Sequence, residues 1–238
     1  MNQNQNSNII IALDAINYAD ALYLAKTLRN MVWGFKVNDL LIEHGIKVIT
    51  DLRQFGRVFA DPKLHDIPNT VKNSIQKIAS AGADFITVHA SGGMAMIKAA
   101  VEAACAEGGH TAKILAVTAL TSLNDEDTNV IYGKDSSSTV TSLARIALDS
   151  KCFGIVCSAQ ELPLLADMQN LNKLAKIVPG IRPAWHTTSD DQNRTDTPLH
   201  ALSKGADYLV IGRPITKNRD PIAAIRSIMN DEITYGSA

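Results

Sequence analysis

The sequence has almost no net charge and no run of basic residues. Its 23 Lys and Arg are balanced by 24 Asp and Glu. Proteins that bind a nucleic-acid backbone need clustered Lys and Arg, so we expect no nucleic-acid partner. No apolar run approaches the roughly 18 residues that a membrane span requires, so we expect no membrane partner. The N-terminal segment MNQNQNS is polar and lacks the apolar stretch of a secretory signal. These absences predict a soluble, cytoplasmic protein.

Cysteine is also scarce. The chain contains Cys105, Cys152 and Cys157, an odd number, widely spaced and without a CxxC pair. Disulfide frameworks and structural metal sites need paired or closely spaced cysteines. We therefore predict buried free thiols in a reducing compartment.

The chain does contain a repeated alternation of short apolar runs and longer amphipathic segments. Apolar runs rich in Val, Ile and Leu predict strands at 9–14, 34–38, 57–61, 84–90, 113–119, 153–158, 176–181 and 207–212. Between them, small and apolar residues recur at helical spacing, as in 19–32, 71–81 and 94–106. Two Gly-Ala-Asp turns, at 82–84 and 205–207, are typical of a helix end followed by a strand.

The predicted strands are almost continuously apolar rather than alternating, which is typical of a parallel sheet buried on both faces. Eight strand–helix units in 238 residues, with no linker-like segment, favour an α/β fold of the (β/α)8 barrel (TIM barrel) type. A doubly wound open sheet is the alternative. We expect residues 1–238 to form a single barrel domain in which 1–8 are a disordered tail.

Ionisable residues collect where the predicted strands end. The first strand ends in Asp14, the second carries Lys36, and the third provides Asp61 and Lys63, with Asp66 just beyond. A single polar residue at a strand end is more often structural than catalytic. Several charges on one rim must, however, pair or stay hydrated, and active sites of such barrels lie at this rim. We therefore predict a preorganised array of alternating charges.

The last two strands suggest a site for phosphate. The segment IGRP places Gly212 where the backbone can approach a ligand closely, and Arg213 follows it. Barrels of this type often bind phosphate with the loops after strands seven and eight, and Arg suits phosphate oxygens. Together with Arg182 and Gln192 of the polar seventh loop, these residues predict a phosphate grip.

Several segments together resemble the orotidine 5′-monophosphate decarboxylase family. They span residues 9 to about 230 and read IALD, FKV, DPKLHDIPNT, VTALTS, VCSAQE, PGIRP, DQNR and VIGRPIT. In a barrel of this kind the motif DxKxxDIxxT is highly specific, whereas DxKxxD alone is weak. The resemblance implies decarboxylation of orotidine 5′-monophosphate to uridine 5′-monophosphate, the last step of de novo pyrimidine nucleotide synthesis, without a metal or organic cofactor.

The resemblance also implies a role for each matching residue. Lys63 is the proton donor, beside Asp61 and Asp66, and Lys36 completes the charged array. The remaining matches are substrate contacts: Asp14 at the ribose, Thr121 along the pyrimidine, and Arg182, Gln192, Gly212 and Arg213 at the phosphate. The family forms homodimers with shared active sites, in which Asp66, Ile67 and Thr70 enter the neighbouring subunit's site.

Two alternatives and one departure accompany this interpretation. A magnesium-dependent sugar-phosphate decarboxylase on the same barrel would share the DxKxxD strand, but its second strand carries a metal-binding glutamate where this chain has Lys36. A non-catalytic binding protein would not need Lys63 between two carboxylates. The departure is FKVND: relatives usually have a small residue after FKV, so Asn38 and Asp39 crowd that part of the rim.

Overall fold

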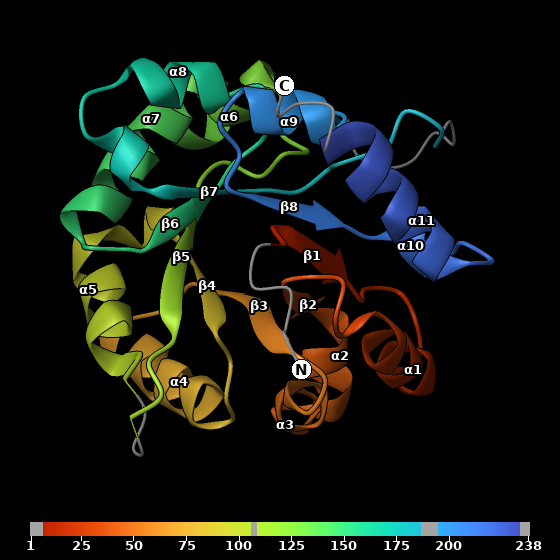
Figure 1. Cartoon of the computed structure of the whole chain (residues 1–238). Coiled ribbons are helices and arrows are strands. Elements are labelled where there is room, and N and C mark those ends of the chain that lie inside the picture. The colour runs from red at the N-terminus through yellow and green to blue at the C-terminus, as the bar shows by residue number, and fades with distance from the viewer. Residues whose placement is uncertain (1–6, 106–108, 187–194, 234–238) are drawn as a thin grey trace.

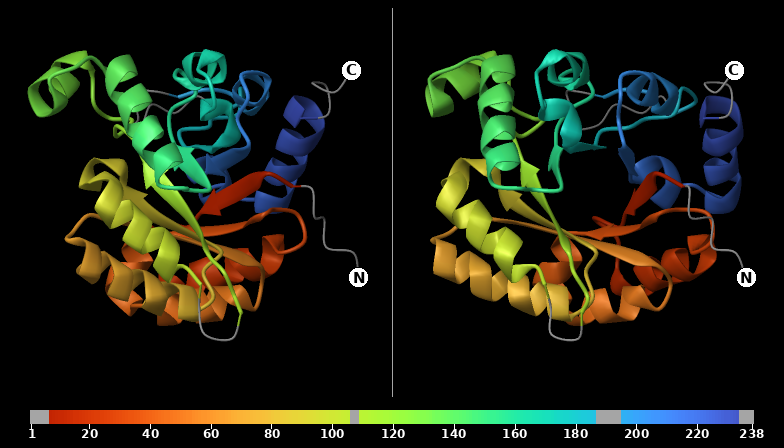
Figure 2. Two further views of the ribbon diagram at one scale, coloured as in Figure 1. Left: turned by 90° about the vertical axis from the view of Figure 1, so that its left-hand side faces the viewer. Right: turned by 60° about the vertical axis from the view of Figure 1, so that its left-hand side comes forward.

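The computed structural model describes residues 7–105, 109–186 and 195–233, and within them eight parallel strands close into a barrel. The strands pair in sequence order, and β8 pairs with β1. Figure 1 shows the strands at the centre with the helices around them, and Figure 2 shows the same arrangement from two other directions. The predicted (β/α)8 barrel is confirmed, and the open-sheet alternative is excluded because the sheet has no free edge.

The observed elements follow the predicted order. The strands are β1 Ile9–Ala12, β2 Gly34–Val37, β3 Arg57–Leu64, β4 Phe85–His89, β5 Lys113–Val117, β6 Gly154–Val156, β7 Ala175–Val178 and β8 Tyr208–Ile211. The helices are α1 Tyr18–Leu28, α2 Asp39–His44, α3 Lys47–Arg53, α4 Pro68–Ser80, α5 Gly93–Ala103, α6 Asp125–Tyr132, α7 Ser136–Asp149, α8 Leu162–Asp167, α9 Pro198–Ser203, α10 Arg213–Thr216 and α11 Pro221–Ser227. The 3-10 helices η1 Ala90–Gly92 and η2 Leu171–Lys173 and the π-helix η3 Ile228–Ile233 complete the described elements.

The apolar strands are buried on both faces, as predicted. Along β1, Ile9 and Ile11 pack outward against the helices, whereas Ile10 and Ala12 point into the barrel. This alternation explains why the strands read as continuous apolar runs. At the N-terminal end of the barrel, Trp33 stacks on Phe85 with ring centroids 4.3 Å apart. Apolar packing therefore fills that end.

The two Gly-Ala-Asp turns behave alike. Gly82 and Gly205 both have positive φ, of 98° and 96°, as expected where a helix ends in the left-handed region. The aspartate of each turn then accepts a hydrogen bond from the start of the preceding strand: Asp84 Oδ2 accepts from the Val58 amide of β3, and Asp207 Oδ2 from the Lys176 amide of β7, both at 2.8 Å. The same Gly-Ala-Asp turn thus connects the end of a helix to the start of the next strand at two places in the barrel.

The cysteines follow the prediction only in part. Cys152 and Cys157 are buried, and burial raises the pKa of Cys152 to about 12. Cys105 is exposed, so the predicted burial is wrong there. The residue lies beyond the end of α5, in the connection to β5.

Two further observations concern the chain's ends and its helices. Of the predicted tail 1–8, residues 1–6 lie outside the described part, and the Asn8 carbonyl accepts a 2.9 Å hydrogen bond from the Leu209 amide. No helix among the described residues is long and apolar enough to cross a membrane.

Glycine at the start of β2 allows close approach of the neighbouring strand. A Cβ on Gly34 would lie 2.2 Å from the Arg57 carbonyl oxygen, whereas one on Gly56 would come only within 3.3 Å of the Phe35 ring. Gly34→Ala should therefore lower the free energy of unfolding by about 1–3 kcal/mol, the usual effect of overpacking. Urea titration measures this, with Gly56→Ala as the matched control. An equal effect of both substitutions would contradict the steric argument.

Candidate active site

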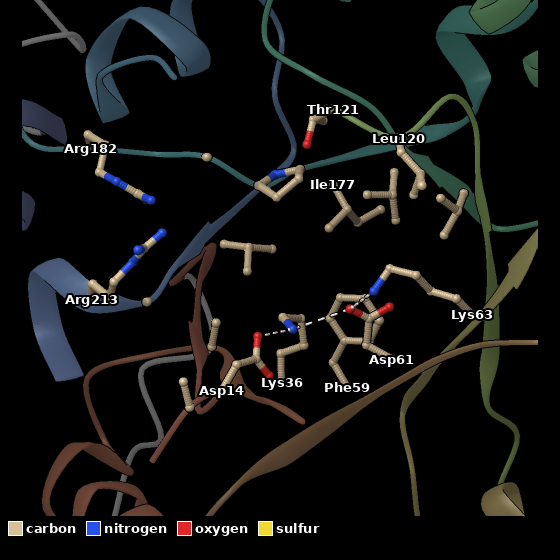
Figure 3. A pocket seen from close by; sticks show the side chains of 18 of the residues that line it. Asp14, Lys36, Phe59, Asp61, Lys63, Leu120, Thr121, Ile177, Arg182 and Arg213 are labelled. Atoms are coloured by element: carbon tan, nitrogen blue, oxygen red, sulfur yellow. Dashed lines mark hydrogen bonds and ion pairs between the residues drawn. The ribbon is translucent and has the colours of Figure 1, made fainter. Parts of the chain in front are cut away.

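A cavity of about 420 Å3 lies at the C-terminal ends of the strands. Its walls include apolar side chains of five strands: Phe59, Val117, Val156, Ile177 and Val210. Charged side chains lie at two separate ends of this apolar space (Figure 3). The cavity can therefore hold a flat, largely apolar group between two polar groups.

One end carries an unbroken chain of ion pairs (Figure 3). Lys36 Nζ lies 2.5 Å from Asp14 Oδ2 and 3.2 Å from Asp61 Oδ2. The same Asp61 oxygen lies 2.7 Å from Lys63 Nζ. Because β1, β2 and β3 are neighbours in the barrel, their ends bring these four residues together. The predicted array of alternating charges is formed, although its catalytic roles remain a prediction.

Burial and charge pairing act against each other in this array. Burial alone would lower the pKa of Lys36, but the carboxylates of Asp61 and Asp14 outweigh it and raise the pKa. Burial alone would raise the pKa of Asp61, but the ammonium groups of Lys36 and Lys63, with their hydrogen bonds, lower it. Lys36 and Asp61 are therefore both charged near neutral pH, and each favours the charged form of the other.

The backbone that carries Asp61 and Lys63 is not a regular strand. Regular alternation would place both side chains on one face. Instead, Lys63 has a φ of +49°, and the β3–β4 register shifts between Ala60 and Leu64. Bulges and left-handed non-glycine residues of this kind concentrate at functional sites, where they redirect a side chain. The side chains of Asp61 and Lys63 do meet, but they do so through an irregular backbone that their two-residue spacing did not predict.

The other end of the cavity is basic. Arg182 follows β7, Arg213 follows β8, and their guanidinium groups extend toward each other (Figure 3). Gly180, Gly212 and Lys217 line the cavity beside them. A Cβ added at Gly212 would lie 3.5 Å from the Ala12 Cβ, which is an ordinary contact. Packing against Ala12 therefore does not require a glycine at this position. Gln192, the fourth residue of the predicted phosphate grip, lies outside the described residues.

The remaining predicted residues divide into two groups. Thr121 lines the cavity between its two ends (Figure 3). Asp66, Ile67 and Thr70 do not line it: all three are exposed, and Asp66 Oδ1 accepts a 2.6 Å hydrogen bond from the Ile67 amide. Within a single chain these three residues therefore lie outside the cavity.

Sequence reasoning missed three polar residues that the structure connects with the site. Lys217 is one helical turn after Arg213, a spacing that could have indicated it. Thr87 is a polar residue inside an apolar strand, and its hydroxyl donates to Asp61 Oδ1 at 2.8 Å. Asn38, noted only as crowding the rim, donates from Nδ2 to the Asp61 carbonyl at 2.6 Å. Among the described residues no group of three or more His, Cys, Asp or Glu is arranged to hold a metal ion.

Comparison with known proteins agrees with this geometry. The model of the Orotidine 5'-phosphate decarboxylase / HUMPS family matches residues 7–228. Orotidine 5'-phosphate decarboxylase of Dichelobacter nodosus is 42% identical over 226 residues, which cover 94% of this chain and 97% of that protein. The enzyme of the same name from Cutibacterium acnes is 40% identical over 226 residues, covering 93% of this chain and 94% of that protein.

A solved structure extends the likeness to the fold. The crystal structure of orotidine 5'-phosphate decarboxylase from Lactobacillus acidophilus superposes with a TM-score of 0.78 and 34% sequence identity, covering 96% of this chain and all of that one. The match therefore covers nearly the whole barrel. On these grounds the chain belongs to the Orotidine 5'-phosphate decarboxylase / HUMPS family.

Proposed function

We propose that this protein catalyses the decarboxylation of orotidine 5′-monophosphate to uridine 5′-monophosphate without a metal or organic cofactor. The observation that carries the proposal is the ion-paired array Asp14–Lys36–Asp61–Lys63, at the opposite end of the cavity from two arginines. The names of the relatives at about 40% identity support the same activity. A nucleotide substrate also matches a cavity that is polar at both ends and apolar between them.

The two ends of the cavity determine how the substrate binds. Arg182 and Arg213 hold the phosphate, with Gln192 and the Gly212 backbone beside them, and the cation of Lys217 adds to the attraction. Asp14 Oδ1 is buried and accepts no hydrogen bond from the described residues. A buried carboxylate oxygen without a donor is unfavourable, so a ribose hydroxyl that donates to it satisfies it. The pyrimidine then lies along Thr121, with C6 toward Lys63.

The reaction needs charge stabilisation and a proton. When the bond from C6 to the carboxylate carbon breaks, CO2 leaves and the electron pair remains on C6 in the ring plane. No cofactor supplies an electron sink, so the protein must stabilise this carbanion electrostatically. The Lys63 ammonium does so and then transfers a proton from Nζ to C6, leaving a neutral amine that regains a proton from water.

The neighbouring charges prepare Lys63 for this step. Asp61 Oδ2 accepts from Lys63 Nζ at 2.7 Å and so orients the ammonium. The substrate's scissile carboxylate beside Asp61 brings two like charges together, and this repulsion is relieved as CO2 leaves; we assign it a secondary role. The phosphate binds far from the reacting carbon, so its binding energy is available for positioning and for excluding water.

The charge array also bears on the alternative functions. In a magnesium-dependent sugar-phosphate decarboxylase, carboxylates at this rim would bind the metal. Here the Lys36 ammonium lies between Asp14 and Asp61, and together with Lys63 it balances their two negative charges, so a further cation there would be repelled. A non-catalytic binding protein would have no reason to bury Lys36 and Asp61 beside two further charges, since buried charge is costly unless paired.

We further infer a cytoplasmic homodimer with shared active sites. Ile67 is 67% exposed, an unusual position for a large apolar side chain beside a functional motif. A partner subunit that covers this surface would bury Ile67 and bring Asp66 and Thr70 into its own cavity. Asp66 would then supply the second carboxylate near Lys63 that the single chain lacks at this place.

The first prediction tests the activity itself. Purified protein treated with EDTA should decarboxylate orotidine 5′-monophosphate, seen as loss of pyrimidine absorbance. Lys63→Ala should abolish turnover by several orders of magnitude while circular dichroism stays unchanged, because the proposed proton donor is gone. The exposed Lys47→Ala is the matched control and should retain full activity.

Retention of a tenth of the wild-type rate by Lys63→Ala would contradict the mechanism. Turnover of a sugar phosphate only after adding Mg2+ would instead favour the lyase.

The second prediction separates the phosphate grip from the chemistry. Arg213→Ala should raise KM about 10- to 100-fold, because charge-assisted hydrogen bonds contribute roughly 1.5–3 kcal/mol each. Steady-state kinetics measure this, with Arg219→Ala, an exposed arginine outside the cavity, as control. The nucleoside orotidine, which lacks phosphate, should be affected little. If Arg213→Ala slows orotidine as much as the nucleotide, Arg213 does not bind phosphate.

The third prediction concerns the shared site. Lys63→Ala and Asp66→Ala proteins should each be strongly impaired, yet a mixture that exchanges subunits should recover activity. Each mixed dimer would have one site with both defects and one with neither. After random exchange of equal amounts, roughly a quarter of all sites would be intact, given two-fold symmetry. Mixtures that stay inactive, although exchange is shown by mass spectrometry, would assign Asp66 to its own chain.

A further inference from the structure

The segment Asp61–Lys63 lies where β3 loses its regular partners on both sides. On the β2 side, the last paired residues are Val37 and Ala60, because β2 then turns into α2. On the β4 side, Ala60 pairs with Ile86 and Leu64 with Val88, so three residues of β3 face one residue of β4. The backbone of Asp61–Lys63 is therefore not held by regular hydrogen bonds to β2 or β4.

The side chain of Asn38 replaces the missing contact on the β2 side. Asn38 directly follows the last paired residue of β2, and its Nδ2 donates to the Asp61 carbonyl at 2.6 Å. The amide thus adds one hydrogen bond at the position where the backbone ladder stops. A glycine or alanine at position 38 would leave this carbonyl without that donor.

Thr87 makes the contact on the β4 side and is the residue that faces the bulge. Its hydroxyl is fully buried, donates to Asp61 Oδ1 at 2.8 Å, and accepts from the Lys63 amide at 3.0 Å. A hydroxyl has one proton and two lone pairs, so it can make both bonds at once. One side chain therefore connects the carboxylate of Asp61 with the backbone of Lys63.

We propose that Asn38 and Thr87 are positioning residues that hold Asp61 and Lys63 in their reactive arrangement. The proposal rests on the proposed function, because the arrangement matters for proton transfer to C6. Lys63 adopts a φ of +49°, a conformation that a non-glycine residue keeps only when its surroundings enforce it. Without the two side chains the segment relaxes toward a regular strand, and the Lys63 ammonium moves away from C6.

The Thr87 hydroxyl also has a consequence for pH dependence. Asp61 is faced by Lys36 from β2, by Lys63 from its own strand, and by His89 from β4. After burial and the two lysines, the Thr87 hydrogen bond is a further contribution that lowers the pKa of Asp61. Removal of the hydroxyl raises this pKa. Because the carboxylate form orients Lys63, the acidic limb of the kcat profile then moves to higher pH.

The experiment compares Thr87→Val with Thr118→Val. Both lose one buried hydroxyl, but Thr118 Oγ1 donates to the Val156 carbonyl and contacts none of the four central charges. We expect Thr87→Val to lower kcat about 10- to 100-fold, since displacement of a catalytic group by ~1 Å has effects of this size. KM should change by less than about threefold, because substrate binding groups are untouched. Thr118→Val should leave both parameters near wild type.

Two further variants keep the test decisive. Thr87→Ser retains the hydroxyl and should restore kcat and the pH profile, and Asn38→Ala should lower kcat in the same way as Thr87→Val. The proposal is overturned if Thr87→Val equals Thr118→Val, or if Thr87→Ser stays as slow as Thr87→Val. If Thr87→Val does not fold, Asn38→Ala alone tests the proposal. An unchanged kcat in Asn38→Ala would then overturn it.

A measurement without turnover separates this proposal from the proposed function. Carbon-13 NMR of labelled aspartate follows the titration of Asp61, whose pKa should be higher in Thr87→Val than in the wild type and in Thr118→Val. If the wild type does not decarboxylate orotidine 5′-monophosphate, the proposed function fails, and the titration still tests the arrangement. If the wild type is active but the Asp61 titration is the same in all three proteins, only the positioning proposal fails.

Discussion

The ammonium of Lys36 between the carboxylates of Asp14 and Asp61 is the interaction on which the site depends. A lysine and an aspartate that are both buried are unfavourable alone and tolerable only together. Loss of Lys36 would leave the buried carboxylate of Asp61 with one cation fewer, so these two buried charges depend on each other. Asp61, kept charged in this array, in turn orients Lys63. Neighbouring strands β1, β2 and β3 each contribute to it, and the register of the closed barrel therefore determines the chemistry.

The cavity separates two tasks in space. The charged array lies at the ends of the first three strands, and the basic group of Arg182, Arg213 and Lys217 follows the last two. Apolar side chains cover the distance between them, so neither set of charges neutralises the other. This separation supports a substrate whose anionic handle is remote from its reacting atom.

Much of this could be predicted from the sequence, and the reasons are local. Eight apolar runs indicated eight strands because strands buried on both faces need apolar residues at every position. Asp14, Lys36, Asp61 and Lys63 were predicted to meet because the carboxyl ends of parallel strands lie on one rim. Other features were not predicted. The left-handed Lys63 and the shifted β3–β4 register depend on contacts with Thr87 and Asn38, which are distant in sequence. The exposure of Cys105 likewise depends on where α5 ends.

The sequence by itself determined the order of the strands, the parallel architecture and the set of charges at the strand ends, whereas closure of the sheet was settled by the structure. Those properties follow from hydrophobic periodicity and from residue types, which short segments carry on their own. Only the tertiary structure showed which carboxylate oxygens of the array pair with which lysine ammonium groups. It also showed that Asp66, Ile67 and Thr70 lie outside their own chain's cavity. It also turned Asn38 from an unexplained departure into a contact with the Asp61 carbonyl. The physical reason is that hydrogen bonds act over about 3 Å, and only the closed barrel brings residues 20 to 50 positions apart within that distance.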